Sequence, residues 1–167
     1  MALFIWPKLN TFSSKKEIPL SNRFHLAVEG GDLSITVPWY QKVLGCKLDM
    51  AEEGKWQDID FWGNELTLHE SKPRQGKGPE RERHSVDMGE VCVPHFGIHL
   101  SYDDFNIVKK TVLENGGFLD TPYIRFEGTD YQQETFFVED PNFNVLEIKS
   151  MAKDNIDLDI EAVGEGC

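Results

Sequence analysis

Two stretches of the chain, about 22–71 and 93–150, repeat one order of apolar and polar patterns. The first opens with a β-like run at Arg23–Val28, and a turn of Gly and Asp follows it. Asp32 can cap a helix that reaches Leu44 and stops at Gly45. Pro38 is awkward inside a helix, so we expect the regular helix to begin near Pro38 after a looser first turn. Three strand-like runs complete this stretch: Cys46–Met50, Trp56–Trp62 and Glu65–His69.

The second stretch follows the same order. It opens with a strand-like run at His95–Ser101, and Asp103–Asn115 has apolar residues at helical spacing before Gly116 and Gly117. Strand-like runs are then expected near Phe118–Asp120, Glu134–Val138 and Val145–Lys149. The pattern therefore predicts two tandem βαβββ modules of the α+β class, which build one curved, mostly antiparallel sheet with the helices outside.

Three polar segments set the expected domain boundaries. We expect residues 1–21 to form an N-terminal arm and residues 151–167 to form an acidic tail. Residues 72–90 are rich in Gly, Pro and charge, which is typical of a solvated stretch, and it makes up most of the connector 72–92 between modules 22–71 and 93–150. The sequence thus predicts a single domain over 22–150.

Charge and cysteine content narrow the class of protein. A net charge of −12 disfavours nucleic-acid and anionic-membrane partners. Three cysteines with no CxxC pair indicate a reducing compartment, and Met1–Pro7 has no basic residue ahead of its short apolar run. We therefore expect a cytoplasmic protein, with an organellar presequence as the alternative.

Ligand-type side chains stand at corresponding places in the two modules. His25 and His95 lie on the opening strands, while His69 and Glu147 lie on the last strands. A pseudo-twofold pairing of the modules would bring all four to one cavity. Imidazole and carboxylate groups bind divalent Zn, Fe, Mn, Ni or Co, so we expect one of these metals as cofactor.

Two further residues are candidates for chemistry. His99 follows His95 by four residues, so strand alternation points both to the same face, where His99 could act as acid or base. The alternative is a hydrogen-bonded core histidine. Arg125 could bind an anionic substrate, and the alternative is a surface ion pair with Glu127 or Glu134.

The chain resembles the vicinal oxygen chelate superfamily, which includes glyoxalase I, fosfomycin-resistance enzymes, extradiol dioxygenases and bleomycin-resistance proteins. The resemblance covers about 24–150, through FHLAVEGGDL, WYQKVLGC, DFWGNELTLHE, PHFGIHLSYDDF and FFVEDPNFNVLEIK. It implies that His25, His95 and Glu147 bind a metal. His69 stands where many members carry a fourth ligand, commonly a carboxylate, so a histidine there is a departure. The resemblance also implies a homodimer, with the site either within one chain or between two.

The number of ligands selects the expected reaction. Three ligands, His25, His95 and Glu147, leave three open positions and favour Fe(II) and dioxygen chemistry on a catechol. A fourth ligand at His69 suits a glyoxalase-like lyase or isomerase, in which Glu147 moves a proton. The expected function is a metal-dependent enzyme on a small-molecule substrate, and the four-ligand version is favoured. The alternatives are an extradiol dioxygenase and a non-catalytic protein that sequesters a small ligand.

Overall fold

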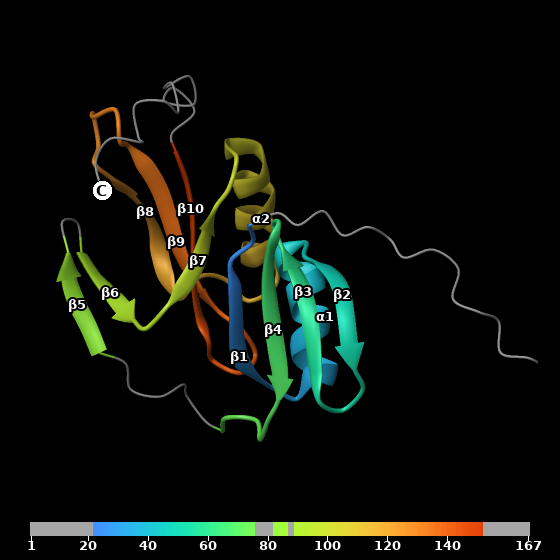
Figure 1. The fold of residues 1–167 in the computed structure, drawn as a ribbon. Helices are drawn as coiled ribbons and strands as arrows, with labels where there is room; N and C mark the ends of the chain where they lie inside the picture. The colour runs from blue at the N-terminus through green and yellow to red at the C-terminus, as the bar shows by residue number, and fades with distance from the viewer. Residues whose placement is uncertain (1–21, 76–81, 87–88, 152–167) are drawn as a thin grey trace, which may run out of the picture.

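The computed structural model describes residues 22–75, 82–86 and 89–151, and Figure 1 shows their arrangement. The first module is a four-stranded sheet in the order β1-β4-β3-β2, in which β1 runs parallel to β4 and the other pairs are antiparallel. Its elements are β1 (His25–Gly31), α1 (Leu33–Leu44), β2 (Lys47–Glu52), β3 (Trp56–Phe61) and β4 (Asn64–Glu70).

The second module repeats this topology as β7-β10-β9-β8, again with its first and last strands parallel. The α+β class and the two βαβββ modules are therefore confirmed, although the modules form two four-stranded sheets rather than one continuous sheet. The elements of this module are β7 (Phe96–His99), α2 (Tyr102–Glu114), β8 (Asp120–Arg125), β9 (Gln133–Glu139) and β10 (Val145–Met151).

Helix α1 corrects one sequence-based prediction, because it begins at Leu33 rather than near Pro38. The Asp32 carboxylate accepts a hydrogen bond from Ser34 N at 2.9 Å, and the Thr36 hydroxyl donates to the Gly30 carbonyl at 2.6 Å. These contacts secure the first turn. Pro38 removes only one hydrogen bond from the interior of the helix, and the packing of the buried helix face outweighs that loss.

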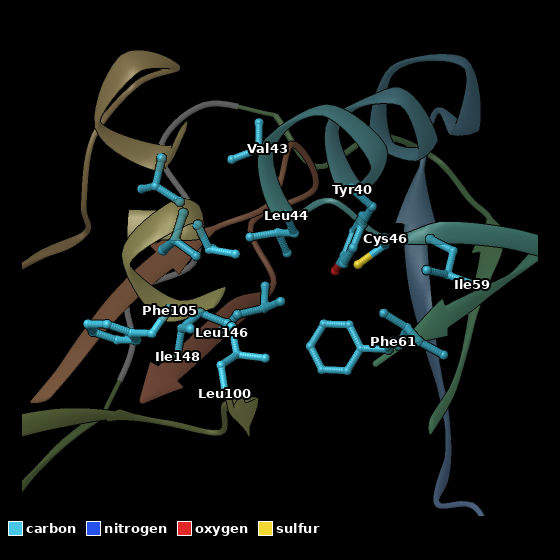
Figure 2. Close-up of a cluster of buried hydrophobic side chains, with 14 of the residues drawn as sticks. Tyr40, Val43, Leu44, Cys46, Ile59, Phe61, Leu100, Phe105, Leu146 and Ile148 are labelled. Carbon is cyan, nitrogen blue, oxygen red and sulfur yellow. The ribbon is translucent and has the colours of Figure 1, made fainter. Parts of the chain in front are cut away.

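One hydrophobic core serves both modules. Side chains of α1 and α2 meet between the two sheets, as Figure 2 shows for Tyr40, Leu44 and Phe105 with Phe61 and Leu146. In both sheets the core therefore lies against the face that bears the helices. Because side chains alternate along a strand, the residues between these core positions point to the opposite, open face of each sheet.

Part of the connector predicted over residues 72–92 forms a short hairpin. Strands β5 (Glu82–Val86) and β6 (Gly89–Val93) pair antiparallel, as Figure 1 shows beside the second module. Val91 and Cys92 of β6 are buried against Phe137 and Val145 on the open face of the second sheet. These two residues follow the charged run 72–90, in which β5 residues 82–85 are exposed.

Strand β8 also differs from the prediction, because it spans Asp120–Arg125 instead of 118–120. In the described part of the chain, neither helix is both long enough and apolar enough to cross a lipid bilayer. The predicted arm 1–21 and nearly all of the predicted tail 151–167 lie outside the described residues.

Candidate metal centre

The open face of the first sheet brings His25 beside a carboxylate. Leu26 and Leu66 pack toward the core, so their neighbours His25 and Glu65 point to the open face. The two residues are directly opposite each other in the parallel β1–β4 pair. His25 Nδ1 lies 2.7 Å from Glu65 Oε1. A carboxylate only accepts hydrogen bonds, so Nδ1 carries a proton and Nε2 is the ring nitrogen that a metal could bind.

His95, which directly precedes β7, is held in the same way by a different acceptor. Its Nδ1 lies 2.5 Å from the Cys92 carbonyl oxygen, and its Nε2 lies 3.4 Å from Glu147 Oε2. The carbonyl fixes the proton on Nδ1, so Nε2 faces the carboxylate. Phe137 supports the ring edge-on, with centroids 5.3 Å apart. The hydrogen bond to Glu147 raises the pKa of His95 above its ordinary value, and the one to Cys92 adds to this, although burial opposes both.

Glu147 is the most buried of these groups. Its side chain is 5% exposed and receives a hydrogen bond from the Thr135 hydroxyl at 3.0 Å. Lys149 Nζ lies 2.7 Å from its other oxygen, Oε2. Burial alone would raise the pKa of Glu147, but the hydrogen bonds from His95, Lys149 and Thr135 outweigh it and lower the pKa to about 2. The side chain is therefore a carboxylate at neutral pH, as a metal ligand must be.

The depressed pKa of Glu147 predicts a specific loss of stability in acid. Because the folded-state pKa of about 2 lies below the ordinary value of 4.5, the stabilisation is complete above pH 4.5 and is lost as the pH falls toward 2. With a chelator present, we expect the free energy of unfolding to fall by about 2 kcal/mol more in this window than in Glu147→Gln. Urea unfolding at several pH values measures this difference. Parallel curves for the two proteins would contradict the prediction.

His99 lies on the same face, opposite Lys149 in the β7–β10 pair. Burial, followed by the charge of Lys149, lowers the pKa of His99 below its ordinary value. A neutral imidazole at this position can accept a proton. A cavity of about 570 Å³ is lined here by His95, Phe96, Gly97, Ile98, His99, Glu147 and Lys149.

Two predicted site residues lie away from these groups. His69 is exposed on β4, four residues and thus roughly 13 Å along the strand from Glu65. Arg125 on β8 lies opposite Gln133 on β9, and Gln133 lies opposite Met151 on β10. Arg125 is therefore two strands away from β10, at the level of a residue four positions beyond Glu147. Its guanidinium is 5.0 Å from the Phe126 ring. The structure thus brings neither residue to His25, His95 or Glu147.

Strand register explains the place of His69. In the first module His25 lies opposite Glu65, and in the second Gly97, two residues after His95, lies opposite Glu147. The first-module residue equivalent to Glu147 is therefore Thr67, whose hydroxyl donates to Asp58 at 2.5 Å. His69 is equivalent to Lys149. No carboxylate stands in the first module at the position of Glu147.

The described residues contain two half-sites rather than one complete site. Nowhere among them do three histidine, cysteine, aspartate or glutamate side chains come close enough to hold a metal ion. His25 with Glu65 forms one pair, and His95 with Glu147 forms the other. Both histidines hold Nδ1 against an oxygen acceptor, which is typical of metal-binding histidines, so Nε2 is the nitrogen that a metal would bind. At His95 a metal would replace the Nε2 proton that now faces Glu147. Together with the ionised Glu147 carboxylate, these donors fit a divalent transition metal.

Sequence reasoning did not single out Glu65 or Lys149. Both could have been found by strand alternation. Glu65 shares the face of His69 four residues away, and parallel pairing of the first and last strands sets it beside His25. Lys149 follows Glu147 by two residues and so shares its face.

Solved structures supply the comparison with known proteins. A glyoxalase/bleomycin resistance protein/dioxygenase from Alicyclobacillus acidocaldarius is 31% identical, with a TM-score of 0.60, over 81% of this chain and 96% of that chain. Lactoylglutathione lyase from Agrobacterium tumefaciens shares the fold at 14% identity, with a TM-score of 0.52, over 79% of this chain and 95% of its own. The fosfomycin resistance protein FosX from Listeria monocytogenes also shares the fold, at 12% identity and with a TM-score of 0.50, over 81% of this chain and 95% of its own. No protein-family model and no curated protein matches the chain.

Proposed function

The chain belongs to the glyoxalase/bleomycin resistance protein/dioxygenase family of the vicinal oxygen chelate superfamily, and from that membership we propose that it is a divalent-metal-dependent enzyme. Its substrate is a small molecule with two adjacent oxygen atoms. The observation that carries the proposal is that His25 and His95 each hold Nδ1 against an oxygen acceptor, and that His95 Nε2 faces the Glu147 carboxylate at 3.4 Å, where a metal could replace its proton.

The ligands are His25 of one copy of the chain together with His95 and Glu147 of a second copy. The two half-sites support this division, because each lies on a sheet face directed away from the core that both modules share. Pairing two copies would join the first half-site of each to the second half-site of the other, which is the symmetry of a closed dimer. His69 is left out of the ligand set because of its distance from Glu65.

The reaction that fits three protein ligands is extradiol ring cleavage of a catechol by dioxygen. A divalent metal bound by two histidines and one carboxylate would stabilise negative charge on two adjacent substrate oxygens and keep further positions open. His99, neutral and on the face of His95, accepts a proton from a substrate hydroxyl. Glu147 stays ionised and holds its place through Thr135. The glyoxalase-like reaction needs a fourth ligand, for which Thr67 and the remote His69 offer no support.

Metal content and subunit complementation test the ligand set. We expect untagged protein, purified without chelators, to hold about one metal per chain, and His25→Ala or His95→Ala to lose it together with activity. Co-expression of these two variants should restore about a quarter of wild-type activity, because half of the dimers are mixed and each mixed dimer has one intact site. His84→Ala on the exposed β5 strand is the matched control.

The outcomes separate the alternatives. Loss of metal without complementation would place the site within one chain. Full metal content in both variants would overturn the ligand set, and a protein with no metal affinity would favour a sequestering protein.

For the reaction itself, anaerobic Fe(II) loading followed by oxygen and a catechol panel should give a yellow ring-cleaved product. Turnover of a glutathione–methylglyoxal adduct instead would favour the lyase or isomerase.

A further inference from the structure

Lys149 makes the shortest contact to Glu147 in the half-site of His95 and Glu147, and it has no role in the proposed ligand set. Its Nζ lies 2.7 Å from Glu147 Oε2, the same oxygen that faces His95 Nε2 at 3.4 Å. The Lys149 side chain is 21% exposed, so the ion pair is largely sheltered from water. A sheltered ammonium–carboxylate contact is stronger than one on the surface.

The ammonium and a metal would bind the same carboxylate oxygen. We infer that a divalent metal displaces Lys149 from Glu147, and that the displaced ammonium then binds an anionic group of the substrate. This inference rests on the proposed function, because it takes Glu147 and His95 as metal ligands. It adds a specificity residue and narrows the substrate to molecules that carry an anion besides the two adjacent oxygens.

The surroundings of Lys149 leave its ammonium without another carboxylate to bind. Among the described residues that line the cavity of about 570 Å³, Glu147 is the sole carboxylate. Thr135 and His99 are the cross-strand neighbours of Lys149, and neither is an anion. Once the charge of Glu147 is shared with a metal, the ammonium needs a negative partner at the open side of the cavity.

The chemistry of that partner follows from its neighbours. Ammonium groups bind carboxylate and phosphonate oxygens as point charges, without the fork geometry that arginine requires. Lys149 follows Glu147 by two residues on β10, so the two side chains are neighbours on one face of the strand. The anionic group that binds Lys149 must therefore lie a few bonds from the substrate oxygens that face the metal. A catechol that carries a ring carboxylate satisfies both conditions.

Metal affinity is the first measurement, because it needs no turnover. Zn²⁺ is titrated into chelator-treated protein in competition with a chromophoric chelator. We expect Lys149→Met to bind Zn²⁺ about tenfold more tightly than the wild type, since the metal no longer competes with an ammonium and its binding relieves a buried, unpaired carboxylate. Lys149→Arg should stay near the wild type. Lys110→Met, at a largely exposed helix position, is the matched control.

Ligand preference is the second measurement. Calorimetry compares catechol with 3,4-dihydroxybenzoate, which differs by one carboxylate, on Zn²⁺-loaded protein. We expect the wild type and Lys149→Arg to prefer the carboxylate-bearing ligand by about tenfold, and Lys149→Met to lose that preference while still binding catechol. Thermal unfolding of each variant confirms that it is folded.

The outcomes distinguish this inference from the proposed function. If the wild type binds Zn²⁺ but Lys149→Met changes neither metal affinity nor ligand preference, the inference is overturned and the proposed function stands. If the wild type binds no Zn²⁺ while Lys149→Met does, the competition is supported and the metal-dependent function is overturned. If no variant binds Zn²⁺, both are overturned.

Discussion

Replacing Gly97 with alanine is expected to destabilise the protein by about 4 kcal/mol or more, because the added methyl group would meet a backbone atom. A Cβ at Gly97 would lie 1.8 Å from the Glu147 carbonyl oxygen and 2.7 Å from its carbonyl carbon. Neither atom can move without separating β7 from β10. The same shift would displace the Glu147 side chain from His95 and Thr135, so the variant should also lose metal affinity.

Urea unfolding followed by tryptophan fluorescence measures the loss of stability, and metal titration measures the second effect. Ala27→Gly is the matched control, since Ala27 occupies the equivalent position of the first module, two residues after His25. We expect this control to cost about 1 kcal/mol or less. A Gly97→Ala protein within 1 kcal/mol of the wild type would show that the two strands can separate cheaply.

Asp140→Ala is expected to cost about 3–4 kcal/mol, because one buried carboxylate organises the whole turn between β9 and β10. Asp140 is 3% exposed. It accepts hydrogen bonds from the Asn142 and Asn144 backbone N–H groups, each at 2.8 Å, and from the Asn144 side chain at 2.7 Å. The Tyr40 hydroxyl of α1 donates a fourth at 3.1 Å.

The turn also joins the two modules. The side-chain amides of Asn142 and Asn144 donate to the Glu29 carbonyl of β1 at 2.9 and 2.8 Å. Asp140→Ala should therefore loosen the first module from the second as well as the turn itself. Equilibrium urea unfolding is the measurement. Tyr40→Phe, which removes one hydrogen bond, should cost about 1 kcal/mol. Asp49→Ala on the exposed β2 strand should cost almost nothing, and an Asp140→Ala loss as small as that would contradict the prediction.

Local patterns along the chain determined the modules. Alternating runs specified most of the strands, and Gly45 marked the end of α1, whereas the regular helix was expected to begin near Pro38 and begins at Leu33. Repetition of the pattern placed His25 and His95 at the openings of equivalent strands, and Glu147 on the final strand. Each of these inferences needs only neighbouring residues, because caps, stops and strand alternation act within a few positions.

Tertiary structure decided what depends on register and long-range packing. The pairing of β1 with β4 sets Glu65, and not His69, beside His25, since a strand's partner is chosen by side chains far along the chain. Burial of Val91 and Cys92 packs β6 against the second sheet, and the Cys92 carbonyl oxygen then lies beside His95 Nδ1. The shared core directs the two half-sites away from it on separate sheet faces. The sequence by itself determined which residues carry ligand-type side chains. Only the fold decided which of these side chains lie close together. Their placement depends on how the two modules pack, which is set by the free energy of burying both helix faces in one core.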